Sequence, residues 1–502
     1  MQSEIFRQTW QFPNFIDSAF NGFDDNQSQL HYFPTKFPDD PLLMDFPIED
    51  FLMDFDGYGP IDPITSPPLN GGEESVHGQW SPLSSSSLKS DESSVTEASQ
   101  ASGTLSLPAE DMEIDTQLSL QHLAKAFGEA MENGQADLME AVSRCGVEKA
   151  NPLGGACDRL VFNLFRRAGR REGCDDYIRQ ECQRNSEAAF QAFYQGFPFM
   201  RFAHFAANSA ILGSAPRGFG VVIRVVDFDL GEGVQWAPVI EAMAARGGVS
   251  LLRLTSIKWA EDDPEEAKED DSHDCPGRSG RRLRDTSRRL SEHAREFGVQ
   301  LEVDEMRIDE LLIEAKEGMA MNGRREWFVF NCMVGLMGRK NRNRKLVGKF
   351  LSAAEEVITA NNCGIVTLGE GDAFQKLKSC SGFGEFFDGC LGHYQTVLEC
   401  METEFPSQLL EARLAMEALF VSPSIDPTSW GETWDEVRAC SGVMDGIQAR
   451  LRGLRVSREG LMEARELVGG KSWYGVGTGE RENEMVLQWR GNPLVRFSAW
   501  GR

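Results

Sequence analysis

Apolar residues recur at helical spacing along the chain from residue 117 onward. Four large apolar residues stand at positions i, i+3, i+7 and i+11, on one face of a helix, and they are Leu120, Leu123, Phe127 and Met131. Further helical patterns follow at residues 136–144, 156–168, 176–195 and 200–212. The sequence therefore predicts a leucine-rich helical cap over residues 117–213.

The leucine-lined face of the first helix has two interpretations. Apolar side chains at this spacing most often form the core of a helical bundle. The same kind of face can bind a second bundle, and the spacing does not separate the two uses. We expect the face to contribute to partner binding through the residues Leu120, Leu123, Phe127 and Met131.

Beyond Pro216 the pattern changes to strands that alternate with helices. Short apolar runs predict strands at residues 220–229, 251–257, 299–306, 327–334 and 364–371. Strands separated by helices are joined by crossover connections, so these runs predict a doubly wound parallel sheet. The fold class is therefore α/β, with a Rossmann-like core over residues 214–502 behind the helical cap.

The carboxyl-terminal end of the chain reads as an antiparallel hairpin. Apolar residues at 485–489 and 494–500 flank a turn from Arg490 to Pro493. We expect this hairpin to lie on the edge of the sheet, with Trp500 packed there.

The first 116 residues have a different composition from the rest of the chain. They contain 21 acidic and three basic residues, and so carry 18 of the 27 net negative charges. Phenylalanines alternate with acids up to residue 60, and serines follow, so the segment lacks the aliphatic residues that build a core. We expect residues 1–116 to form a disordered arm.

Acidic and aromatic alternation is also typical of transcriptional activation segments. Charge keeps the rings solvated until they bind in the groove of a coactivator. The candidate rings are Phe46, Phe51 and Phe55. The alternative is a solubilising tail with no partner.

Cysteines and hydropathy indicate an intracellular setting. The 11 cysteines are odd in number and include no C-x-x-C pair, which favours a reducing compartment. The amino terminus has no apolar signal segment, and no apolar run approaches the ~18 to 20 residues that cross a bilayer. Because the net charge is negative, contact with DNA requires a local basic patch or a partner.

One dense basic cluster meets that requirement. Five cations stand within seven residues just after a predicted strand, at Arg339, Lys340, Arg342, Arg344 and Lys345. Such a cluster binds phosphates or serves as a nuclear import signal. The alternative is a solvated helix face, and a second arginine group near residues 281–289 lies beside an acidic insertion that neutralises it.

A glycine loop follows the first predicted strand. Its motif is D-x-D-x-G-x-G, at Asp227, Asp229, Gly231 and Gly233. Doubly wound sheets bind nucleotides at this position, and the loop resembles that of the methyltransferases that use S-adenosylmethionine. However, the second strand ends in Ile257-Lys258, where such an enzyme holds an acid for the ribose hydroxyls. We therefore expect no cofactor.

Motifs for other chemistry are missing from the sequence. No G-x-S-x-G, H-E-x-x-H or phosphate-binding P-loop is present. Cys380, Cys390, His393 and Cys400 are spread too far along one predicted helix to converge on a tetrahedral metal. We expect no catalytic residue and no metal.

Several strings together resemble the plant GRAS transcriptional regulators. IRVVDFDLGEGVQWAPVIEAM is similar to their VHIID motif region, with Arg224 at the position of the motif's histidine, and LRLTSI is similar to their LRIT stretch. WRGNPLVRFSAWGR is similar to their terminal SAW motif, with ten residues between Trp489 and Trp500. Together with the leucine-rich helical region, these strings make four features that occur in the same order as in the family, across residues 117–502.

The resemblance implies a function. GRAS proteins have a methyltransferase-like core without established methyltransferase activity, so it implies a nuclear coactivator that pairs with another GRAS protein on promoter DNA. FPFMRFAHFAANSAIL, the glycine loop and the acidic insertion are most similar to family members in symbiosis signalling. This implies a role in nodulation and mycorrhizal programmes and in regulating strigolactone biosynthesis genes. The alternatives are an S-adenosylmethionine-dependent methyltransferase and a scaffold that activates nothing.

Overall fold

The computed structural model describes most of the chain beyond the acidic arm. The described residues are 116–168, 186–218, 220–259, 278–321, 326–337, 344–371, 377, 379–405, 410–439, 450–469 and 473–502. The arm predicted over residues 1–116 lies outside them except for its last residue. The whole acidic insertion at residues 261–274 and the segment 338–343 also lie outside.

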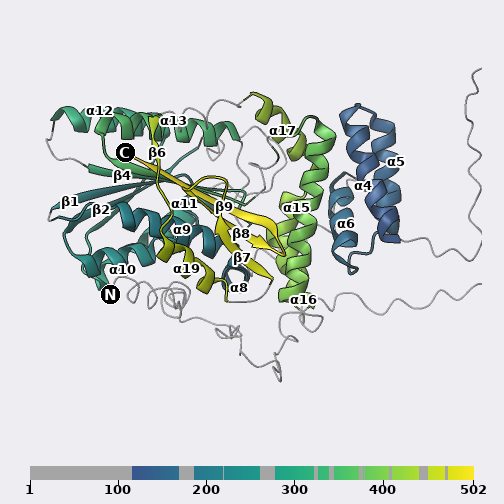
Figure 1. The fold of residues 1–502 in the computed structure, drawn as a ribbon, viewed down its shortest axis with the longest axis horizontal. Coiled ribbons are helices and arrows are strands. Elements are labelled where there is room, and N and C mark those ends of the chain that lie inside the picture. Colours follow the sequence, from purple (N-terminus) through teal and green to yellow (C-terminus); the bar gives the residue numbers. More distant parts are fainter. Residues whose placement is uncertain are drawn as a thin grey trace, which may run out of the picture. The chain divides into compact units, whose positions relative to one another are not determined.

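A mixed sheet forms the centre of the fold (Figure 1). Its parallel part has the order β3-β2-β1-β4-β5 and consists of β1 (Val221–Asp227), β2 (Val249–Ile257), β3 (Leu301–Met306), β4 (Glu326–Val334) and β5 (Gly364–Glu370). The antiparallel strands β9 (Asn492–Gly501), β8 (Glu484–Trp489) and β7 (Tyr474–Thr478) follow β5 in that order, and β6 (Arg452–Gly453) pairs with β9. The predicted doubly wound α/β core is confirmed.

Helices cover both faces of the parallel strands. One face carries α12 (Ile308–Met321) and α13 (Arg344–Asn361), and the other carries α9 (Pro198–Ser214), α10 (Ala237–Arg246), α11 (Arg278–Glu296) and α19 (Arg458–Leu467). Strands buried on both faces are rich in β-branched and aromatic residues without alternation, as the sequences VVIRVVD and EWFVFNCMV show. In contrast, β3 is an edge strand and exposes charged residues, which discourages edge-to-edge pairing.

The carboxyl-terminal hairpin forms as predicted but does not end the sheet. Arg490 and Gly491 have φ values of 47° and 84°, as a two-residue type I′ turn requires. Because β8 and β7 lie beyond β9, Trp500 is in an interior strand and is 2% exposed. The expectation that Trp500 lies at the sheet edge is wrong.

The remaining helices form the cap and its support. The cap helices are α4 (Thr116–Glu132), α5 (Ala136–Lys149) and α6 (Ala156–Ala168), and α8 (Ser186–Gly196) follows them. The support consists of α15 (Phe383–Glu404), α16 (Leu410–Met416), the π-helix η4 (Glu417–Val421), the short 3₁₀ helix η5 (Ser422–Ser424) and α17 (Pro427–Ala439). The three cap helices pack on one another, and α4 and α6 pack on α15.

Helix α9 belongs to the core and not to the cap. It packs against β5 and β9 in the same hydrophobic cluster as the sheet residues Val225 and Ile365. The sequence assigned it to the cap because its period is helical, and periodicity does not say which neighbour a helix covers. The boundary between the cap and the core therefore lies before Pro198, where α9 begins, and not at residue 213.

Candidate functional site

The glycine loop follows β1 at the carboxyl end of the parallel strands. Asp227 is 2% exposed, and its Oδ2 accepts a hydrogen bond of 2.7 Å from Trp236 Nε1. Its Oδ1 accepts from the backbone N–H of Asp229, whose own Oδ1 accepts from the N–H of Gly231. The two aspartates thus hold the backbone of the loop through one carboxylate oxygen each.

Helix α11 covers the loop from outside. Thr286 Oγ1 donates to the carbonyl of Gly231 at 3.1 Å, and Arg289 forms a 3.0 Å ion pair with Glu232, in which both side chains are largely buried. Gly233 has φ +70°, and an added Cβ would lie 2.7 Å from Thr286 and 2.9 Å from Leu290. The close approach that the glycine permits is therefore to a helix of the protein itself.

A buried polar network lies beneath the loop. Asn331 at the carboxyl end of β4 donates to Asp227 Oδ2 at 3.3 Å and exchanges hydrogen bonds with Gln235. Thr367 of β5 donates to Asn331 Oδ1 at 3.0 Å, and Asn208 of α9 donates to the Gln235 carbonyl at 2.8 Å. All five residues are at most 2% exposed, so the network links α9 and three strands.

Aromatic rings fill the space beside this network. Phe228 contacts Trp259 at a ring distance of 5.0 Å and Phe350 of α13 at 5.4 Å. Trp259 Nε1 donates to the Phe228 carbonyl at 3.0 Å. Trp259 follows the end of β2, close to where a methyltransferase would hold its ribose carboxylate. The residues present at this edge therefore do not fit S-adenosylmethionine.

The structure corrects part of the predicted partner-binding face. Leu120 is 0% exposed and Phe127 is 2% exposed, and the Phe127 ring contacts Phe165 of α6 and Phe387 of α15. These two residues lie in the joint between the cap and its support, because the apolar stripe of an amphipathic helix faces the protein interior. They are therefore not available to a partner.

The other two residues of that face are only partly buried. Leu123 and Met131 pack against the margin of the same core. An added Cβ on Gly431 of α17 would lie 2.8 Å from the Met131 methyl group, so Met131 contacts α17. The surface of the cap instead exposes Leu138 of α5 and Leu153 of the following loop, at 45% and 59%.

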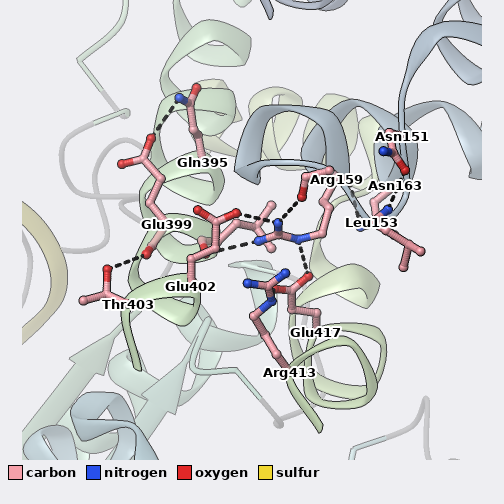
Figure 2. Close-up of polar contacts among 12 residues, drawn as sticks. Asn151, Leu153, Arg159, Asn163, Gln395, Glu399, Glu402, Thr403, Arg413 and Glu417 are labelled. Atoms are coloured by element: carbon pink, nitrogen blue, oxygen red, sulfur yellow. Dashed lines mark hydrogen bonds and ion pairs between the residues drawn. The ribbon is translucent and has the colours of Figure 1, made fainter. Parts of the chain in front are cut away.

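A buried charge cluster joins the cap to its support (Figure 2). Arg159 of α6 is 1% exposed, and its Nε donates to Glu417 Oε2 at 2.8 Å. Its Nη1 donates to Glu402 Oε1 and to the Gly154 carbonyl, both at 2.6 Å. Arg413 Nε lies 3.5 Å from Glu417 Oε1. Burial raises the pKa of the Glu417 carboxyl, against the opposing effect of Arg159.

The geometry of this cluster fixes the position of α6. Glu402 lies on α15, and Glu417 is the first residue of the π-helix η4, so one guanidinium connects three elements. Both acids stand more than 240 residues from Arg159 in the sequence. No local sequence pattern marks these residues as partners, which is why the sequence analysis missed the cluster.

The basic cluster is only partly described by the structure. Arg339, Lys340 and Arg342 lie outside the described residues. Arg344 is 8% exposed, its Nη1 lies 3.1 Å from Glu370 Oε1, and its backbone N–H donates to Glu436. Arg344 is thus buried in the fold and is not available for the predicted DNA contact or nuclear import, whereas Lys345 is exposed on α13.

The two tryptophans of the terminal motif are buried in the hydrophobic core. Trp489 is 1% exposed and packs with the helices on one side of the sheet, whereas Trp500 packs in the cluster on the other side.

The candidate activation residues Phe46, Phe51 and Phe55 lie outside the described residues. In the part of the chain that the structure describes, no helix is long and apolar enough to span a bilayer.

Comparison with known proteins identifies the family. Residues 119–501 match the GRAS domain family. The chain is 30% identical over 337 residues to Protein NODULATION SIGNALING PATHWAY 2 of Medicago truncatula, which covers 63% of this chain and 59% of that protein. It is 28% identical over 334 residues to the protein of the same name from Lotus japonicus, covering 64% and 60%. It is also 28% identical over 322 residues to Protein SLENDER RICE1-LIKE 1 of Oryza sativa, covering 62% and 59%.

The matches thus span 59–60% of the length of these three relatives. Among solved structures, SCL7 of Oryza sativa is similar in fold, with a TM-score of 0.50 and 20% sequence identity. That similarity covers 77% of this chain and 99% of the SCL7 chain. Since the family match extends over more than half of the sequence, the chain belongs to the GRAS domain family.

Proposed function

We propose that this protein is a nuclear coactivator of transcription that pairs with a second GRAS protein through its cap. The supporting observation is that the cap carries three of the six exposed large apolar side chains among the described residues, namely Leu118, Leu138 and Leu153. We infer that these side chains belong to one interface, since exposed apolar patches mark sites of protein interaction. A cap fixed by the Arg159 cluster presents this surface in a constant orientation.

The pathway in this proposal is symbiosis signalling. The names of the relatives from Medicago truncatula and Lotus japonicus support nodulation signalling. We extend the proposal to mycorrhizal programmes and strigolactone biosynthesis genes on the sequence resemblance. In this scheme Phe46, Phe51 and Phe55 bind a coactivator. Nuclear import or DNA contact falls to the exposed or undescribed cations, which are Arg339, Lys340, Arg342 and Lys345.

A charge on the cap surface tests the pairing. In the full-length chain, Leu138→Glu combined with Leu153→Glu places two carboxylates in the proposed contact. Burying such charges is costly, so we expect the dissociation constant for the second GRAS protein to rise at least about tenfold, as calorimetry would measure. Leu120→Glu is unsuitable, because that buried position would disrupt the cap itself.

A matched control is available on the core. Ile313 of α12 is 59% exposed, like Leu153, but lies far from the cap in the sequence and on a different element. Ile313→Glu should leave the dissociation constant unchanged. If the cap variants bind as tightly as the control while keeping its melting temperature, pairing does not use this surface.

The same geometry supports a role without catalysis. The edge where a methyltransferase binds its cofactor is filled by Thr286, Leu290 and Trp259. Titration of the full-length chain with S-adenosylmethionine up to about 1 mM, the upper range of ordinary KM values, should give no saturable heat. Saturable binding would favour the alternative of a methyltransferase.

A further inference from the structure

Exposed arginines line the segment that leads through β6 into α19. We call them the arginine strip, which consists of Arg450, Arg452, Arg455 and Arg458 together with Arg502 at the end of β9. The leucines between them point inward, since Leu451 is 3% exposed and Leu454 packs against the core. The sequence analysis did not identify the strip, because apolar residues separate its arginines.

Pairing within the fold brings three of these arginines together. Arg452 stands opposite the last residue of β9, directly before Arg502. Arg450 Nε lies 3.1 Å from Glu355 Oε1 of α13, and Arg502 Nη1 donates to the Thr359 carbonyl of the same helix at 3.0 Å. Since these two α13 residues are one helical turn apart, the guanidinium groups of Arg450 and Arg502 lie side by side.

The positive charge of the strip is only partly offset. Arg455 Nε lies 3.8 Å from Glu482 Oε2, but the two side chains are 80% and 78% exposed, so this ion pair is weak. No ion pair to Arg452 or Arg458 occurs in the described part of the chain. The strip therefore has an excess of positive charge, and a ligand that fits it carries negative charge.

Strand β6 also has one open side. Among the described strands it pairs with β9 alone, where the Leu454 N–H donates to the Ala499 carbonyl at 3.0 Å. Because successive residues of a strand direct their backbone groups to opposite sides, Gly453 directs its N–H and carbonyl away from β9. Gly453 is exposed, so an extended peptide can add to this edge.

We propose that the arginine strip binds an extended acidic segment of a partner protein, which pairs with the edge of β6. Carboxylates along such a segment accept charge-assisted hydrogen bonds from the guanidinium groups. The open backbone edge favours a peptide over DNA, since a duplex cannot continue a strand ladder. The net charge of −27 also disfavours a long polyanion that extends past the strip. The strip and the cap surface lie on different elements, so this contact is independent of the proposed pairing.

Fluorescence anisotropy of the full-length chain tests this contact at physiological ionic strength. The probe is a labelled peptide of alternating glutamate and threonine. We expect Arg452→Gln, Arg455→Gln and Arg458→Gln together to raise its dissociation constant about tenfold, because three charge-assisted contacts are lost. These three side chains are exposed, so the melting temperature should not change.

A control variant loses the same number of charges elsewhere on the core. It combines Arg295→Gln, Arg307→Gln and Lys316→Gln, all at exposed positions. The dissociation constant should change less than about twofold, because salt screens charges that do not contact the peptide. Equal dissociation constants for the two triple variants would overturn the proposal.

Two further probes make the test specific. The same peptide with N-methyl groups at alternate residues cannot donate to the edge of β6, so it should bind several-fold more weakly. Labelled duplex DNA should also bind more weakly than the peptide. The proposal would be overturned if the wild type does not bind the peptide or binds the methylated probe equally well. Tighter binding of DNA that the strip variant abolishes would also overturn it.

Discussion

At the residue scale, Arg159 shows how one side chain holds the cap in place. Its removal in Arg159→Met leaves Glu417 buried without its main partner. Breaking a buried ion pair from one side typically costs about 3–5 kcal/mol, so we expect a loss of that size in the free energy of unfolding. Urea titration of the full-length chain would measure it.

The exposed ion pair between Arg144 and Glu140 provides the control for this prediction. Both side chains are mostly in solvent, so Arg144→Met should change the free energy of unfolding by less than about 1 kcal/mol. The double variant Arg159→Met with Glu417→Leu should recover part of the loss, because it removes the orphaned carboxylate. Equal effects of Arg159→Met and Arg144→Met would contradict the account of the cluster.

Gly233→Ala tests whether helix α11 covers the glycine loop, and Gly134→Ala is the matched control. Both have positive φ, at +70° and +64°, but only a Cβ on Gly233 would collide with α11. The left-handed conformation alone costs about 1–2 kcal/mol, as expected for Gly134→Ala. Gly233→Ala should lose about 1–3 kcal/mol more, from overpacking against Thr286 and Leu290. Equal losses in urea titrations would mean that α11 does not cover the loop.

At the element scale, β9 stabilises the sheet from an interior position. Trp500 packs with Val366 of β5 and Phe350 of α13 in the cluster behind the sheet. We expect Trp500→Ala to lower the free energy of unfolding by about 3–5 kcal/mol. Phe297→Ala, at a 44% exposed position, should cost less than about 1 kcal/mol. A small effect at Trp500 would contradict its placement in the core.

The strands that the sequence predicted well are those with an unbroken apolar run. The runs that became β1, β4 and β5 are continuous and apolar, as expected for strands buried on both faces. In contrast, β7 has the sequence YGVGT, in which two glycines remove the strand pattern, and it was not predicted. The assignment of α9 to the cap was wrong, because the period of a helix does not determine which element it packs against.

The candidate site was less predictable than the fold for the same reason. The loop residues Asp227 and Gly233 could be found from their spacing after a strand. Their neighbours Asn331 and Thr367 come from strands about 100 or more residues later, and only the assembled sheet edge brings them together. A cation count identified the cluster containing Arg344, but charge along the sequence does not reveal a buried ion pair with Glu370.

At the scale of the whole molecule, a closed doubly wound core supports an exposed helical cap. The core fills the edge beside its glycine loop with its own side chains, and the charge cluster fixes the cap beside it. Under the proposed function, the surface of the cap recognises the partner and the sheet stabilises the fold. Because the chain is net acidic, the proposed function assigns the contacts with promoter phosphates to the partner.

Promoter binding across a salt series tests this account most directly. Fluorescence anisotropy would follow labelled promoter DNA with the full-length chain alone, with the second GRAS protein alone, and with both. We predict that this chain joins the DNA only in the mixture, and that Leu138→Glu with Leu153→Glu abolishes the joint complex whereas Ile313→Glu does not. Specific binding by this chain alone, with a steep salt dependence and no effect of the cap variants, would contradict the account.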